Sequence, residues 1–154
     1  MRAAPFGLCR FWLGLAMGLL LASDSGLVSA KRYLRCELAK KLLDPPYRFD
    51  RSLLSNWICL LEHESDLDTS RITSNPNGTR NYGLFQINSR FCQEGRRGGI
   101  CNVKCEDLLE ENLMEASVCA KRIHSSDGFQ HWNGWQRHCR NTQNLPNLRV
   151  ICGI

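Results

Sequence analysis

One helical segment organises the chain: Leu53-Leu54-Ser55-Asn56-Trp57-Ile58-Cys59-Leu60-Leu61-Glu62-His63-Glu64. At about 100° of rotation per residue, its leucines, isoleucine and tryptophan gather on one side of a helix, and Glu64 falls on that side. Asp50 precedes the segment and is a suitable cap for its N-terminus. Glu62 lies on nearly the opposite side, where we expect water to solvate it. The pattern therefore predicts an amphipathic helix whose last carboxyl group points toward the core.

The position of Glu64 has a chemical consequence. A carboxyl group bordered by apolar side chains is harder to ionise, and the negative end of the helix dipole adds to this effect. Both effects favour the protonated form, which a general acid needs in order to protonate a departing oxygen. A second interpretation stays open at this point, because a glutamate at a helix end can also reach water by bending.

Two further regular elements flank this helix. Apolar residues recur at helical spacing from Arg35 to Leu43, and Asp44-Pro45-Pro46 ends that helix because proline lacks the amide hydrogen and restricts the backbone. From Thr69 to Asn88, β-branched and aromatic residues flank Asn77-Gly78, a pair that tolerates the positive φ angles of a tight turn. We expect a small antiparallel sheet there.

The second half of the chain continues with a cysteine-dense loop from Phe91 to Cys105 and a predicted helix over about Asp107 to Arg122. The candidate core positions of this helix are Leu108, Leu109, Leu113, Val118 and Ile123. Short helices and loops are expected from Phe129 to Ile154. No internal repeat or linker interrupts the pattern, so residues 31–154 are expected to form one α+β domain.

The first thirty residues have the pattern of a secretory signal peptide. Arg2 and Arg10 make a basic start, 11–22 is apolar, and Val28-Ser29-Ala30 is a small-residue cleavage site. A membrane anchor is the alternative, but the apolar run is shorter than the roughly 20 residues that a spanning helix needs. The whole chain has a net charge of +5, and residues 31–154 keep about +4. A mild basic excess favours anionic surfaces or simply keeps a domain soluble.

Eight of the nine cysteines remain once the segment containing Cys9 is removed. An even number of cysteines in a secreted chain implies disulfides, although spacing alone cannot choose their pairing. A metal site is the alternative, since Cys101 and Cys105 are four residues apart and three histidines lie downstream, at His124, His131 and His138. An oxidising compartment favours disulfides, so we expect no metal and no cofactor.

Several short strings together carry a family resemblance. They are Arg35-Cys36-Glu37-Leu38-Ala39, Asn56-Trp57-Ile58-Cys59, Glu64-Ser65, Tyr82-Gly83-Leu84-Phe85-Gln86-Ile87-Asn88-Ser89, Cys101-Asn102-Val103-Lys104-Cys105 and Ala116-Ser117-Val118-Cys119-Ala120-Lys121. The chain resembles the c-type lysozyme and α-lactalbumin family, and its insect members most closely. The resemblance runs from Lys31 to Cys152 and includes all eight cysteines.

This resemblance implies a two-lobed fold with a sugar-binding cleft between helices and hairpin. It also implies four bridges, Cys36–Cys152, Cys59–Cys139, Cys92–Cys105 and Cys101–Cys119. The implied activity is hydrolysis of the β-1,4 bond between N-acetylmuramic acid and N-acetylglucosamine in peptidoglycan, with Glu64 matching the family's general acid.

The main departure from the family is at the second catalytic carboxylate, whose position is occupied by Asn81. Lysozyme is the type case of the retaining mechanism, in which the two carboxyl groups lie about 5–5.5 Å apart and the second stabilises or captures the sugar cation. A neutral amide does neither well. No carboxylate lies between Asp68 and Glu94, while Arg71 and Arg80 add positive charge to this segment. The expected hydrolase is therefore of reduced activity.

Other cleft residues carry over by motif. Gln86 and Asn88 match sugar-contacting residues of the hairpin, and Asn75 matches an amide near the bond that is cleaved. Trp132 matches the tryptophan beside the catalytic acid, and Trp135 a more buried core ring. Before Cys92 the family usually has two aromatic residues, whereas this chain has Ser89-Arg90-Phe91, with one aromatic and one residue fewer. Phe91 alone is therefore expected to stack on a sugar.

Two modification or metal sites also need consideration. Asn77-Gly78-Thr79 is an N-glycosylation sequon at the predicted hairpin tip, although Asn-Gly is equally the preferred turn pair. Some relatives bind calcium, and the matching stretch offers Glu110, Asn112 and Glu115, with Ala116 at an expected ligand position. Calcium prefers a full set of oxygen ligands, so we expect no calcium site.

The leading hypothesis is a secreted, monomeric and antibacterial muramidase that acts on peptidoglycan or a related oligosaccharide, with no nucleic-acid partner and no membrane span. One alternative is a catalytically silent saccharide-binding protein. A second is a lactalbumin-like modulator of another protein, which would have no need of Glu64.

Overall fold

The structure is a computed structural model that describes residues 30–154, so the predicted signal segment lies outside the described residues except for Ala30. The helical elements, with η marking a short 3₁₀ helix, are α1 (Arg35–Leu43), η1 (Arg51–Leu53), α2 (Leu54–Ser65), η2 (Glu106–Leu109), α3 (Met114–Asp127), η3 (Phe129–His131), α4 (Asn133–His138), η4 (Thr142–Asn144) and α5 (Leu148–Cys152). Within this part of the chain, no helix has the length and apolar character needed to cross a membrane.

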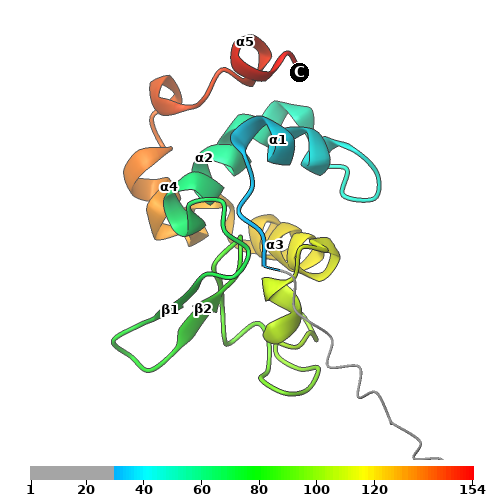
Figure 1. Cartoon of the computed structure of the whole chain (residues 1–154). Coiled ribbons are helices and arrows are strands. Elements are labelled where there is room, and N and C mark those ends of the chain that lie inside the picture. Colours follow the sequence, from blue (N-terminus) through cyan, green and yellow to red (C-terminus); the bar gives the residue numbers. More distant parts are fainter. Residues whose placement is uncertain (1–29) are drawn as a thin grey trace, which may run out of the picture.

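The helices and the sheet occupy different parts of the molecule (Figure 1). Strands β1 (Ile72–Ser74), β2 (Arg80–Tyr82) and β3 (Ile87–Asn88) form an antiparallel sheet in the order β1-β2-β3. The tip between β1 and β2 turns at Gly78, whose φ is +81°, as the Asn-Gly pair predicts. The expected α+β class is confirmed.

Helix α2 forms as predicted and begins one turn after its expected cap. The Asp50 carboxylate accepts a hydrogen bond from the Ser52 backbone N–H at 2.8 Å and so caps η1, which leads directly into α2. Glu62 differs from the expectation. Its carboxylate pairs with the Arg35 guanidinium of α1 and is only partly exposed, because α1 packs against this side of α2.

One apolar core joins the two lobes, and Trp57 lies at its centre. The Trp57 ring is 2% exposed and meets Phe49 and Trp132 edge-on at centroid distances of 5.2 and 5.7 Å. It also meets Phe85, from the segment before β3, at 5.9 Å. The helix that carries Glu64 is therefore fixed against the sheet lobe by aromatic packing.

The predicted helix over residues 107–122 is in fact two elements, η2 and α3, separated by Glu110 to Leu113. The break rotates the later residues relative to the earlier ones, so the apolar pattern does not describe one continuous face. Leu108, Leu113 and Ile123 are buried as expected and Leu109 is partly buried, but Val118 is 59% exposed and is not a core residue.

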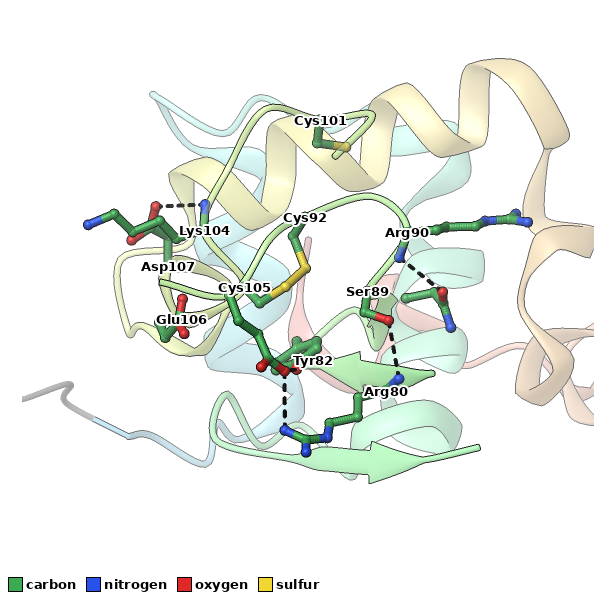
Figure 2. Close-up of a disulfide and its surroundings, with 12 residues drawn as sticks. Arg80, Tyr82, Ser89, Arg90, Cys92, Cys101, Lys104, Cys105, Glu106 and Asp107 are labelled. Atoms are coloured by element: carbon green, nitrogen blue, oxygen red, sulfur yellow. Dashed lines mark hydrogen bonds and ion pairs between the residues drawn. A yellow bond between two sulfur atoms is a disulfide. The ribbon is translucent and has the colours of Figure 1, made fainter. Parts of the chain in front are cut away.

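Four disulfides close the fold, and their pairing is the one that the family resemblance implies. Cys36–Cys152 joins α1 to α5, Cys59–Cys139 joins α2 to the end of α4, and Cys101–Cys119 joins the loop to α3. Cys92–Cys105 closes the loop beside the sheet (Figure 2). The thiolate metal site considered for Cys101 and Cys105 is wrong, because both sulfur atoms are in disulfides.

Candidate active site

A cleft of about 520 Å³ lies between the helical lobe and the sheet. Its lining combines residues from α2, the β1–β2 hairpin, β3 and the start of α4. The lining residues are Glu64, Asn75, Pro76, Asn77, Thr79, Asn81, Gln86, Asn88, Arg90, His131, Trp132 and Asn133. Both residues expected at the catalytic centre, Glu64 and Asn81, therefore face one cavity from opposite lobes.

Glu64 is held at the cleft by the first turn of α4. Its Oε1 atom accepts a hydrogen bond from the backbone N–H of Gly134 at 2.6 Å, and the side chain is half-buried. A Cβ atom at Gly134 would lie 2.7 Å from that same oxygen, which is closer than carbon and oxygen can approach without movement. The absence of a side chain at Gly134 therefore lets α4 fix the Glu64 carboxyl group directly.

The opposite wall is a cluster of amide side chains centred on Asn81. Asn81 lies directly opposite Asn88 in the β2–β3 register. Its Oδ1 atom accepts from Asn88 Nδ2 at 2.9 Å and from Asn75 Nδ2 at 3.0 Å, and its own Nδ2 makes a long 3.4 Å contact with Asn75 Oδ1. The amide oxygen of Asn81 is thus fully used inside the cluster.

The hydroxyl group of Thr79 links two members of this cluster, Asn75 and Asn88. Its hydroxyl oxygen accepts from Asn75 Nδ2 at 2.9 Å and from Asn88 Nδ2 at 3.0 Å, and the hydroxyl donates to Asn77 Oδ1 at 2.7 Å. Hydroxyl oxygens have two lone pairs, so both are occupied. The hairpin wall is consequently a neutral and internally bonded surface whose geometry does not depend on a carboxylate.

The arginines expected to charge this wall do not line the cleft. The Arg80 guanidinium pairs with Glu94 Oε1 at 3.1 Å, and the Tyr82 hydroxyl donates to the same carboxylate (Figure 2). Burial, and secondly the bond to Glu94, raises the pKa of Tyr82 above its usual value, so Tyr82 keeps its proton. Arg71 is exposed outside the cleft, and Arg90 is the arginine that lines it. Arg71 and Arg80 therefore add positive charge to the hairpin segment but not to the lining of the cleft.

Gln86 lines the cleft, but its amide group serves the sheet. Gln86 Nε2 donates to the backbone carbonyls of Arg71 and Gly83 at 2.9 and 2.8 Å. Gln86 Oε1 accepts from the Thr73 hydroxyl at 2.7 Å. The residue is 5% exposed and has a left-handed φ of +46°. Its evident role is to hold the turn before β3, and a sugar contact stays a prediction.

The two tryptophans of the α4 region differ from the expected order of burial. Trp132 lines the cleft, is 3% exposed, and donates from Nε1 to the Phe85 carbonyl at 2.8 Å. Trp135 is only partly buried and donates from Nε1 to Asn56 Oδ1 at 3.0 Å. Trp132, and not Trp135, is the more buried ring, because it sits where α4 meets both α2 and the sheet lobe.

Phe91 does not line the cleft, although it was expected to stack on a sugar. Its side chain is 6% exposed, with the Arg90 guanidinium carbon 4.7 Å from the ring centre and the His131 ring at 5.4 Å. Arg90 and His131 line the cleft in its place. Sequence reasoning missed both as cleft residues, together with Gly134, although Arg90 directly precedes the shortened aromatic segment before Cys92.

The glycosylation and calcium candidates have ordinary structural partners. The Asn77 side chain accepts from the Thr79 backbone at 3.1 Å, in the exposed turn at the cleft edge. Glu115 pairs with Arg97 at 3.0 Å, Asn112 accepts from the Met114 N–H at 3.2 Å, and Ala116 supplies no side-chain oxygen. These residues do not fit a calcium ion.

Comparisons with known proteins agree with this architecture. The model of the C-type lysozyme/alpha-lactalbumin family matches residues 31–152. Lysozyme from Bombyx mori is 45% identical over 121 residues, covering 77% of this chain and 85% of that protein. Sperm acrosome-associated protein 5 from Mus musculus is 39% identical over 117 residues, covering 73% of each.

The comparison of structures points the same way. The crystal structure of a lysozyme from Litopenaeus vannamei superposes with a TM-score of 0.68 at 29% identity, covering 79% of this chain and 97% of that one. With its helices, three-stranded sheet, four bridges and matched residues, the chain belongs to the C-type lysozyme/alpha-lactalbumin family.

Proposed function

We propose that the protein is a secreted glycoside hydrolase that cleaves β-1,4 bonds of peptidoglycan with reduced activity, using Glu64 as its only catalytic carboxyl group. The observation that carries the proposal is the placement of Glu64 on the cleft wall by the Gly134 N–H, opposite the Asn81 cluster. Family membership supports a lysozyme-like function.

The chemistry follows from the two walls. Glu64 donates a proton to the departing glycosidic oxygen, which is the step that needs a positioned acid. The other wall offers Asn81, which has no charge to stabilise the sugar cation and no carboxylate to capture it. Water must then attack the sugar cation, giving its proton to the Glu64 carboxylate, without an anionic partner on the other wall, so turnover is slow.

The Asn81 site is already built to accept a carboxylate. The two N–H groups that bind Asn81 Oδ1, from Asn75 and Asn88, would bind a carboxylate oxygen equally well. The second oxygen of an aspartate would replace the Asn81 Nδ2 group, so the long 3.4 Å bond to Asn75 Oδ1 would be lost and two acceptor oxygens would face each other there. The substitution Asn81→Asp therefore restores a charge at the cost of this one weak bond.

The test is a cell-wall lysis assay with wild-type protein, Glu64→Gln and Asn81→Asp. We expect weak lysis by the wild type, its loss in Glu64→Gln, and an increase of about 100-fold in Asn81→Asp, the scale of one electrostatic group in a transition state. Asn75→Asp is the matched control, because it adds the same charge to the amide that is hydrogen-bonded to Asn81 and should give no comparable gain. Absence of lysis from both wild type and Asn81→Asp would refute the hydrolase proposal.

A second candidate function is saccharide binding without hydrolysis. The hydrogen bonding of the neutral wall favours this function, because Asn81 Oδ1 accepts from both Asn75 and Asn88 without a carboxylate in the cluster. The mouse relative described above has a name that refers to the sperm acrosome and not to lysis. Retention of the protein on insoluble cell walls without clearing them, together with lysis by Asn81→Asp alone, would support this second function.

Secretion is part of the proposal and rests on residues 1–30. Eight cysteines in four disulfides support it, because such bridges persist in oxidising compartments. N-terminal sequencing of protein collected from the medium of expressing cells should begin at Lys31. Retention of the full chain inside the cell would contradict this part.

A further inference from the structure

One end of the cleft has a different character from the amide cluster. There the buried Phe91 ring supports two polar side chains, with the Arg90 guanidinium carbon 4.7 Å from its centre and the His131 ring edge-on at 5.4 Å. Both Arg90 and His131 line the cleft, whereas Phe91 does not. Phe91 was expected to supply an aromatic sugar platform, but its ring instead supports the Arg90 guanidinium, so this end of the cleft presents a cation.

Arg90 is positioned by the same network that holds Asn81. Its backbone N–H donates to Asn88 Oδ1 at 3.1 Å. The Asn88 amide nitrogen in turn donates to Asn81 Oδ1 at 2.9 Å. On the other side, the Arg90 carbonyl accepts from the Ile100 N–H at 3.4 Å. The backbone at Arg90 is thus fixed relative to the catalytic centre, while the exposed side chain rests on Phe91.

The charge of Arg90 is available for a ligand. Two other arginines are paired, Arg80 with Glu94 and Arg97 with Glu115. Among residues 30–154, no carboxylate forms an ion pair with Arg90. Figure 2 shows the Arg80 and Arg90 side chains extending in different directions. An arginine presents several N–H donors in a planar fork that matches a carboxylate.

The rest of the cleft does not oppose an anion at this end. Of the residues that line the cleft, Glu64 is the only one with a carboxyl group, and it is held on the helical wall by Gly134. Asn81 is neutral, so the hairpin wall next to Arg90 carries no negative charge. His131 is oriented by the Asp127 carboxylate, 2.9 Å from Nδ1, and Asp127 itself lies outside the lining.

We propose that Arg90 is a specificity-determining residue that binds a carboxylate on the saccharide, so that the cleft prefers acidic N-acetylhexosamine glycans to neutral ones. This inference rests on the proposed saccharide cleft and adds its substrate class. The carboxylate has two chemical sources, the lactyl group of N-acetylmuramic acid or the acid group of a hexuronic acid. Both present the same planar anion to the guanidinium.

The test compares dissociation constants, measured by calorimetry, for three tetrasaccharides. The first alternates N-acetylglucosamine with N-acetylmuramic acid, the second is the same molecule with its carboxylates converted to methyl amides, and the third alternates N-acetylglucosamine with glucuronic acid. We expect the wild type to bind the first about fivefold more tightly than the second at low salt, the size of one exposed charge pair. Whether the third shares this preference identifies the source of the carboxylate.

The variants assign the effect to one side chain. Arg90→Gln should bind the acid and the amide equally, and Arg90→Lys should keep part of the preference. Arg71→Gln is the control, because it removes one exposed arginine from the same lobe outside the cleft and should bind as the wild type does. Added salt should reduce the preference in the wild type.

The outcomes separate this inference from the proposed function. Equal binding of acid and amide by the wild type, or equal loss of preference in Arg90→Gln and Arg71→Gln, would overturn the role of Arg90 and leave the hydrolase proposal standing. A retained preference without any cell-wall lysis would support Arg90 while refuting hydrolysis. Failure to bind any of the three would overturn both.

Discussion

The helical wall and the hairpin wall of the cleft position their functional groups in different ways. On the helical wall, a backbone N–H from α4 holds Glu64, and a Cβ atom at Gly134 would lie 2.7 Å from the same Glu64 oxygen, so the carboxyl group would have to move. On the hairpin wall, Asn75, Asn81 and Asn88 hold one another through side-chain amides. The helical wall is therefore fixed by a backbone hydrogen bond to Glu64, and the hairpin wall by hydrogen bonds between side chains. A change from carboxylate to amide is therefore tolerated structurally on the second wall.

The largest expected effect concerns the disulfides behind the two walls. Cys59–Cys139 joins α2 to the end of α4 across 80 residues, whereas Cys92–Cys105 closes 13 residues beside the sheet. Replacing either pair with alanines should lower the free energy of unfolding by about 2–5 kcal/mol, and the longer loop should cost about 1.5 kcal/mol more. Denaturant unfolding measures both, and an equal loss would show that the two lobes do not differ in this respect.

The next effect concerns Gly134. In an Asn81→Asp background, Gly134→Ala should reduce cell-wall lysis about 100-fold, because the added Cβ would lie 2.7 Å from Glu64 Oε1 and displace the acid. The melting temperature should change little, since alanine is a good helix former. Gln136→Ala, at an exposed position of the same helix, should leave lysis unchanged. Unchanged lysis in Gly134→Ala would mean that the backbone contact does not position Glu64.

A smaller effect is expected from the hub of the hairpin wall. Thr79→Val removes the oxygen that accepts from Asn75 and Asn88, and should cost about 1 kcal/mol in the free energy of unfolding. Thr79→Ser keeps the hydroxyl and should restore most of this loss. Protein expressed without glycosylation should be used, because Thr79→Val also removes the sequon. Equal stability of the valine and serine variants would contradict the network.

The smallest effect is a pH dependence confined to the helical lobe. The His63 ring stacks on His138 at 4.2 Å, and burial, followed by the charge of His138, lowers the pKa of His63 below 6.5. Burial likewise lowers the pKa of His124. As the pH falls through about 6.5 toward the lower folded-state pKa values, the unfolded chain takes up protons first, so stability present at higher pH is lost.

Melting temperatures between about pH 8 and pH 5 measure this loss. His63→Gln should lose less stability on acidification than the wild type. Asn88→Ala, in the amide cluster, should have a lower melting temperature but the same pH profile, because the hairpin wall has no group that titrates in this range. If the melting temperature of Asn88→Ala depended less on pH than that of the wild type, the acid sensitivity would lie in the sheet lobe, which would contradict this prediction.

The sequence predicted those features that depend on local pattern. The α2 helix and the Asn77-Gly78 turn follow from periodicity and turn chemistry, and both occur as expected. The helical projection also placed Glu64 on the side where the cleft lies. The disulfide pairing came from family resemblance and not from spacing, because many pairings are compatible with the same cysteines.

The features that sequence reasoning missed depend on contacts between distant residues. Gly134 meets Glu64 across 70 positions of the chain, and a single glycine before Trp135 carries no local sign of that contact. The direction of Arg80 is set by Glu94, whose place depends on how the loop folds back. Val118 lies beyond a break in its predicted helix, so its periodic position did not report burial.

The amide cluster also means that the measured lysis can depend on how long a protein sample has been stored. Asparagine side chains lose ammonia slowly in water, and at Asn81 this hydrolysis would produce the very carboxylate that the cluster is able to receive. A small fraction of converted molecules would add to the weak lysis that is expected of the fresh protein. Mass analysis of the Asn81 peptide, alongside assays of new and stored samples, distinguishes the intrinsic turnover of the encoded protein from that of its own degradation product.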